Sequence, residues 1–175
     1  YTINTPNLQT LGLKETYVKK LQYGKMDKLK YLSLGLNVIQ NGKEKASPVT
    51  VLDLQKSKNI AELSVTGCRI NKLDLSSVNK TLRLASITQS GKYPIKQVRL
   101  GKMAALKGLS VSAKCAAIDA SKCSRLNTLE CASYGIFKVK LPKSVQYLTL
   151  TSLDKKGCKS LKLSNCKKLK ALKVI

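Results

Sequence analysis

Hydrophobic residues recur along the chain in a pattern of 14 positions, with apolar side chains at the first, third, ninth, twelfth and fourteenth places. The segment 98–111 shows the pattern clearly, as Val98-x-Leu100, Leu106 and Leu109-x-Val111. Copies begin at residues 21, 52, 73, 98, 118, 139 and 161, and a half copy opens the chain. Most copies start 20–22 residues after the previous one, so the basal period is about 21 residues.

Two copies, 73–84 and 139–150, are shorter by two residues. In the first of them the pattern assigns Leu82 and Leu84 to the interior, and in the second it assigns Leu148 and Leu150.

The paired apolar positions, two residues apart, predict short β-strands, because side chains on one face of a strand recur at every second residue. A 21-residue unit has room for two such strands and two turns, but not for a helix as well. One unit cannot bury its own apolar residues, whereas stacked units bury them in shared columns, each Leu or Val contributing about 1.5–3 kcal/mol. The sequence therefore predicts a parallel solenoid of about eight coils, roughly 40 Å long at about 4.8 Å per coil.

The repeat carries recognisable short motifs. Leu29-x-x-Leu32-x-Leu34 and Leu106-x-x-Leu109-x-Val111 form its first half, and Leu73-Asp74-Leu75-Ser76 forms its second. This combination resembles the short bacterial leucine-rich repeats, in particular the internalin-J-like and BspA-like surface proteins. The resemblance implies an α/β, β-rich fold with little helix, a right-handed leucine-rich repeat solenoid. We expect residues 1–175 to form a single domain that is a segment of a longer protein.

Composition argues against catalysis. The chain has no His, so imidazole cannot serve as a base or as a metal ligand, and neither a phosphate-binding glycine loop nor a nucleophile elbow is present. Asp53, Asp74 and Asp119 recur at one position of the repeat, where we expect each side chain to bond the adjacent turn. We therefore expect no enzyme activity and no cofactor. No apolar run is long enough to span a membrane.

Six cysteines occur without any Cys-x-x-Cys pair, so we expect no metal site. Disulfides are disfavoured because the cysteines that share a position lie two coils apart, about 10 Å, whereas bridged Cα atoms approach within about 7 Å. We expect buried free thiols that pack as small hydrophobic groups.

The net charge of +24, from 33 Lys and Arg against 9 Asp and Glu, gathers at the turns. Two interpretations stay open. The lysines either keep the protein soluble, or they bind a polyanion such as teichoic acid, an anionic glycan or nucleic acid. Sequence-specific nucleic-acid recognition is not expected, because a groove-reading helix is missing and aromatic residues are few. The turn cations are Lys25, Lys28, Lys56, Lys58, Lys80, Lys102, Lys122, Arg125, Lys143, Lys167 and Lys168.

In the family that the repeat resembles, the ninth to fourteenth positions form the concave sheet. We expect its exposed side chains, together with three insertions at one edge, to bind a protein or glycan ligand in a secreted or cell-surface adhesion protein. A cell-wall-associated spacer is the structural alternative. The insertions are Gly35–Val51, Ala85–Gln97 and Thr151–Ser160. The candidate binding residues are Tyr31, Glu62, Arg83, Glu130 and Tyr147 on the sheet, and Tyr93 in the second insertion.

Overall fold

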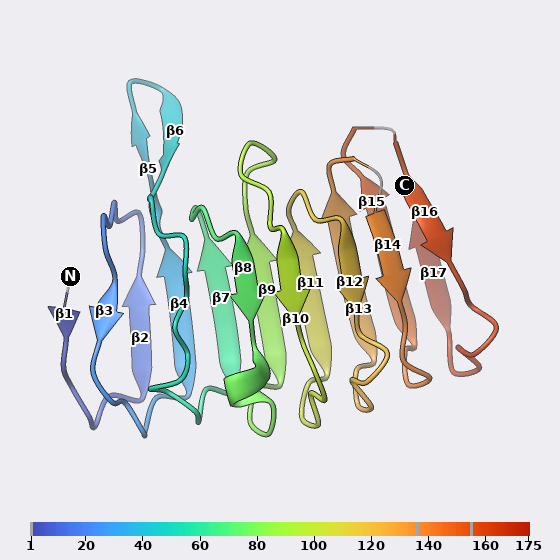
Figure 1. Cartoon of the computed structure of the whole chain (residues 1–175), viewed down its shortest axis with the longest axis horizontal. Helices are drawn as coiled ribbons and strands as arrows, with labels where there is room; N and C mark the ends of the chain where they lie inside the picture. Colours follow the sequence, from blue (N-terminus) through green and yellow to red (C-terminus); the bar gives the residue numbers. More distant parts are fainter. Residues whose placement is uncertain (1, 136, 155) are drawn as a thin grey trace.

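The chain winds into a parallel β-solenoid in the computed structural model, which describes residues 2–135, 137–154 and 156–175 (Figure 1). One side is an eight-stranded sheet in which every neighbouring pair is parallel and the strands follow chain order. Seven windings join these eight strands. The strands are β2 (Thr10–Leu13), β4 (Tyr31–Gly35), β7 (Glu62–Thr66), β9 (Leu84–Thr88), β11 (Gly108–Ser112), β13 (Thr128–Ser133), β15 (Tyr147–Ser152) and β17 (Ala171–Val174).

Shorter strands run in the opposite direction on the other side and form the second layer (Figure 1). Within the described residues the only helical element is a 3-10 turn, Ser76–Val78. The predicted parallel solenoid and its scarcity of helix are confirmed, but the expected α/β class is wrong, because the fold is nearly all β. The shorter strands are β1 (Thr2–Ile3) with β3 (Gln22–Tyr23), β8 (Lys72–Asp74) with β10 (Gln97–Arg99), and β12 (Ala117–Asp119) with β14 (Phe137–Lys140) and β16 (Cys158–Leu161).

The core lies between the two layers and is built from columns of aliphatic side chains. Leu109, Leu129 and Leu148 pair across adjacent strands, and each is at most 2% exposed. Leu106 and Leu126, which precede Leu109 and Leu129 by the predicted three residues, are completely buried. Because identical columns meet at every winding, the apolar pattern of the sequence becomes one continuous core.

The register of β9 differs from the sequence-based prediction. Leu63 of β7 pairs with Ala85, which is 4% exposed, and Leu84 points outward with 48% of its side chain exposed. Leu82 is completely buried, but it fills the column that precedes the strand. The sequence pattern predicted Leu82-x-Leu84 as the buried pair of this strand, but the buried pair is Ala85-x-Ile87. The prediction was wrong because the turn before β9 is longer than the shortened copy suggested.

The three insertions leave the same edge of the solenoid, as predicted (Figure 1). The first forms a hairpin of β5 (Asn37–Gln40) and β6 (Lys43–Ala46), whose antiparallel strands meet at Asn41-Gly42. Both turn residues have positive φ, 52° and 70°, the conformation that Asn-Gly turns favour. The second insertion begins after β9 at Gln89 rather than at Ala85.

Where the insertions interrupt the regular pairing of strands, buried polar side chains form hydrogen bonds with the backbone groups left unpaired. Gln89 is 3% exposed, and its Nε2 donates to the carbonyls of Ile70 and Tyr93. The hydroxyl of Ser47 accepts a bond from the backbone of Val18 at 2.8 Å. These contacts satisfy groups that would otherwise be buried without partners, and so they attach the inserted edge to the core.

The aspartates have the structural role that the sequence predicts. Asp53, Asp74 and Asp119 each accept a bond at Oδ1 from the backbone N–H two residues later. Asp74 also pairs with Arg99 of the next coil at 3.5 Å, and Asp119 pairs with Lys140 at 3.3 Å. The carboxylates therefore organise turns and link coils.

Replacing Asp119 by Asn should destabilise the protein at pH 7 and have less effect near pH 3. Bonds from Ser121, opposed by partial burial and aided by Lys140, lower the pKa of the Asp119 carboxyl in the folded state. A lowered folded pKa stabilises the fold above the unfolded value of about 3.9, and this contribution disappears as the pH falls through the folded pKa. Urea unfolding at both pH values measures it.

Asp119→Ala serves as the comparison because it also removes the acceptor of the turn. It should cost about 1 kcal/mol more than Asp119→Asn at either pH, which is the net value of a hydrogen bond. If Asp119→Asn costs the same at pH 3 as at pH 7, the charge of Asp119 does not stabilise the fold.

All six cysteines are free, and five of them are buried, as predicted. Burial raises the pKa of the Cys68 and Cys131 thiols to about 12. These thiols stay protonated at neutral pH and pack as apolar groups. Among the described residues, no three His, Cys, Asp or Glu side chains are grouped so that they could hold a metal ion.

Candidate functional site

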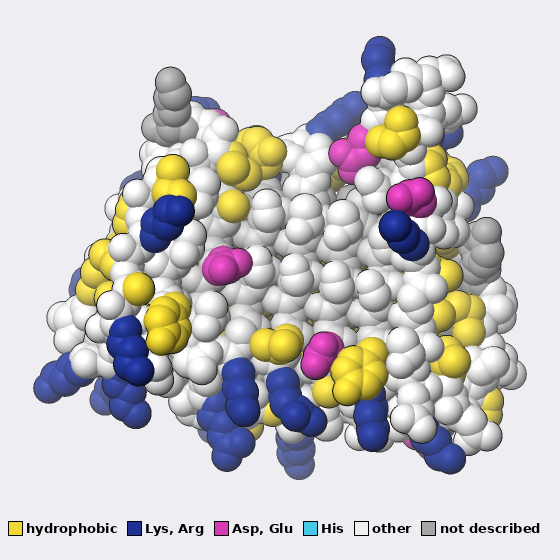
Figure 2. All heavy atoms as spheres, turned by 180° about the vertical axis from the view of Figure 1, so that it is seen from behind, with side chains coloured by type: hydrophobic (Ala, Val, Ile, Leu, Met, Phe, Trp, Pro, Cys, Tyr) yellow, Lys and Arg dark blue, Asp and Glu magenta, His cyan; other side chains and the backbone are white. Residues whose placement is uncertain are grey.

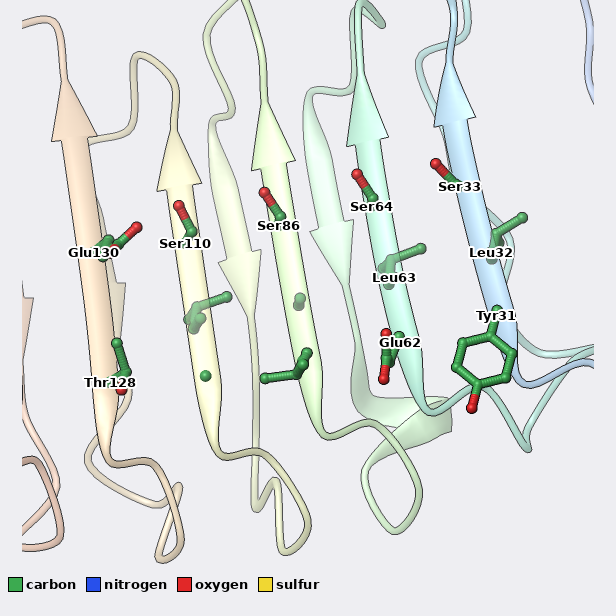
Figure 3. Close-up of a pocket in the computed structure, with 14 residues that line it drawn as sticks. Tyr31, Leu32, Ser33, Glu62, Leu63, Ser64, Ser86, Ser110, Thr128 and Glu130 are labelled. Carbon is green, nitrogen blue, oxygen red and sulfur yellow. The ribbon is translucent and has the colours of Figure 1, made fainter. Parts of the chain in front are cut away.

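The outer face of the large sheet carries two regular columns of side chains, one residue from each strand. The first contains Tyr31, Glu62 and Leu84, followed by Gly108 and Thr128. The second is a row of hydroxyls on β4, β7, β9 and β11, seen side by side in Figure 3. These hydroxyls belong to Ser33, Ser64, Ser86 and Ser110.

A shallow depression of about 400 Å³ lies on this face and extends from Tyr31 on β4 to Glu130 on β13 (Figure 3). Tyr31 is 46% exposed and Leu84 is 48% exposed, so both offer apolar surface to a ligand. A Cβ at Gly108 would lie 2.8 Å from Cδ2 of Leu84, so the glycine provides the room in which the Leu84 side chain lies. The floor therefore combines apolar surface with a row of hydroxyls.

Two carboxylates flank the depression. Glu62 lies beside Tyr31, and Glu130 lies at the other end of the hydroxyl row (Figure 3). Three strand spacings separate them, about 14 Å at about 4.8 Å each, which is too far for a paired-carboxylate mechanism. Neither takes part in a salt bridge within the described part of the chain, so both remain available to accept hydrogen bonds from a ligand.

The structure brings four of the six predicted binding residues to this face. Tyr31, Glu62 and Glu130 line the depression, and Tyr147 lies on β15 beyond it, 45% exposed.

The other two predicted residues lie elsewhere. Arg83 precedes β9 in the turn, because the register places Leu84 rather than Arg83 on the sheet face. Tyr93 lies in the second insertion, where the Arg69 guanidinium stacks 4.6 Å from its ring centre. The sequence prediction missed Leu84, and the signal that could have found it is the alternative buried pair Ala85-x-Ile87.

The charge of the molecule surrounds this face but does not cover it. Figure 2 shows few charged side chains over the middle of the large sheet, and Lys and Arg along the border below it. That border consists of the turns leading into β4 to β17, at 24–30, 55–61, 76–83, 101–107, 121–127, 142–146 and 164–170. We call these turns the basic edge. Its fifteen exposed cations are Lys25, Lys28, Lys30, Lys56, Lys58, Lys80, Arg83, Lys102, Lys107, Lys122, Arg125, Lys143, Lys167, Lys168 and Lys170.

In the part of the chain that the structure describes, no helix has the length and hydrophobicity needed to cross a membrane. Comparison with known protein families, with curated proteins and with solved structures finds no match to this chain. What the structure establishes is an architecture, the parallel β-solenoid, rather than a family.

Proposed function

We propose that the protein is a non-catalytic binding module of a secreted or cell-surface protein, and that the depression on its large sheet binds an extended, neutral glycan. The observation that carries the proposal is the composition of the face. Exposed apolar groups, a hydroxyl row and two carboxylates without salt bridges lie together on a rigid sheet of a strongly basic protein.

This set of groups suits a sugar chain. The ring of Tyr31 and the side chain of Leu84 can cover the apolar face of a pyranose. Serine hydroxyls can donate hydrogen bonds to sugar hydroxyls and accept them, and the Glu62 carboxylate can accept them. A neutral ligand gains these contacts without meeting the repulsion that a cationic peptide would meet at a net charge of +24. A neutral glycan is therefore favoured over a cationic peptide.

A screen of neutral glycans and of peptides at two ionic strengths identifies the ligand, and variants locate its site. Tyr31→Ala and Glu62→Gln should each weaken binding about tenfold, which corresponds to about 1.4 kcal/mol at a central contact. Both side chains are exposed, so the melting temperature should change little.

Ile39→Ala is the matched control, because Ile39 is an exposed apolar residue, 72% accessible, on the β5–β6 hairpin away from the depression. It should leave binding unchanged. Equal affinity for Tyr31→Ala, Glu62→Gln and the wild type would rule out the sheet face. Selective binding of peptides would keep the site and replace the ligand class.

A further inference from the structure

The basic edge concentrates positive charge on one side of the solenoid. It holds fifteen of the 33 cations of the chain but only one of the nine acids, Asp27. That acid pairs with Lys25 at 2.9 Å, and no other salt bridge among the described residues involves this edge. On the opposite layer, by contrast, Arg99 and Lys140 are paired with aspartates of neighbouring coils. Apart from Lys25, the cations of the basic edge therefore make no salt bridge with the described residues.

The edge is also held in a regular geometry by a ladder of backbone hydrogen bonds between coils. The N–H of Arg83 donates to the carbonyl of Ala61 at 2.7 Å, and the N–H of Lys107 donates to that of Arg83 at 2.8 Å. Equivalent bonds of 2.7–2.9 Å continue to Lys170. Each of the seven coils from β4 to β17 therefore presents at least one cation per strand spacing, over six spacings or about 29 Å.

The strand spacing of about 4.8 Å is shorter than the screening length of about 8 Å at physiological salt, so like charges on neighbouring coils repel each other when no anion is bound. A linear anion running along the solenoid axis removes this repulsion at every coil and releases its own counterions. Because the strands already align the cations, binding requires little ordering of the protein backbone.

We propose that the basic edge binds a linear polyanion with phosphate groups along its backbone. This site is separate from the sheet-face site. Thirteen of its fifteen cations are Lys, which act as point charges on flexible stems and suit phosphates of variable position. The seven turns contain no Phe, Tyr or Trp on which bases could stack, so the chemistry favours a phosphate polymer without bases over single-stranded nucleic acid.

The test measures the affinity for sodium polyphosphate of defined chain length, between 50 and 300 mM salt. The edge variant changes Lys102, Lys107, Lys122 and Arg125 to Gln. The matched control, with the same loss of four charges, changes the exposed Lys72, Lys114, Lys138 and Lys159 to Gln. Circular dichroism verifies that both variants are folded.

For the wild type, log K should fall linearly with log salt, with a slope of about −0.7 for each phosphate bound, or about −4 for six contacts. The edge variant should bind at least about tenfold more weakly, with a slope shallower by about 3, whereas the control should stay close to the wild type. Equal loss in both variants would mean that only net charge matters, and would overturn the proposal. So would tighter binding of oligo(dT) than of polyphosphate at equal phosphate concentration.

A second measurement uses the wild type alone. Bound polyphosphate should protect lysines of the basic edge, such as Lys102 and Lys122, from acetylation, and leave Lys114 and Lys138 reactive, as mass spectrometry would record. Uniform protection would contradict a localised site. Tyr31→Ala should bind polyphosphate like the wild type, so failure of the sheet-face proposal and failure of this one are distinguishable.

Discussion

Replacing Leu82 by Ala is expected to lower the free energy of unfolding by about 2–5 kcal/mol, whereas Leu84→Ala should change it by less than about 1 kcal/mol. Leu82 is completely buried in the column that precedes β9, so its truncation leaves a cavity. Leu84 lies on the sheet face, 48% exposed, and loses contact mainly with the open surface beside Gly108. Urea unfolding of the two variants measures the difference.

This pair tests the register of β9, because the sequence pattern alone assigns both leucines to the interior. Leu129→Ala provides the reference for a completely buried strand position and should resemble Leu82→Ala. Two equally large losses for Leu82→Ala and Leu84→Ala would show that the strand is shifted by one residue and that Arg83 faces the ligand. Leu84→Ala should in addition weaken ligand binding at the sheet face.

Gly67→Ala should cost about 2–5 kcal/mol. Gly67 has a φ of +74°, which costs an L-residue about 1–2 kcal/mol. A Cβ at this position would lie 2.4 Å from Cβ of Asn37, at the start of the inserted hairpin, and such overpacking adds about 1–3 kcal/mol. Thermal or urea unfolding gives the total.

Gly101→Ala separates the two contributions, because Gly101 also has a positive φ, +64°, but a Cβ there meets nothing within 4 Å. It should show the backbone cost alone. Adding Asn37→Gly to Gly67→Ala removes the side chain that the new Cβ would contact. The double variant should therefore be more stable than the sum of the two single changes predicts, by the free energy of that steric clash. Equal costs for Gly67→Ala and Gly101→Ala would show that the hairpin does not pack against this turn.

The candidate site was predictable in part. Tyr31, Glu62, Glu130 and Tyr147 reach the sheet face because each lies next to a clear apolar pair, and alternation within a strand decides which side chain faces out. The predicted placement of Arg83 on the sheet face was wrong because its strand offers two apolar pairs of similar quality, Leu82-x-Leu84 and Ala85-x-Ile87. Tyr93 lies in the second insertion, as predicted, but its contact with Arg69 joins segments that are not close in sequence, so only the structure reveals it.

By itself the sequence determined the winding of this protein. A repeated apolar pattern of about 21 residues leaves stacking as the only way to bury every unit, and that stacking places the cations at the turns and the aspartates at one layer. Only the tertiary structure decided the register of β9, the packing of the hairpin on Gly67 and the depression between Tyr31 and Glu130. The physical reason is that a repeat period specifies only the average role of each position. Whether one turn contains an extra residue depends on which side chains best fill the space left by the neighbouring coils.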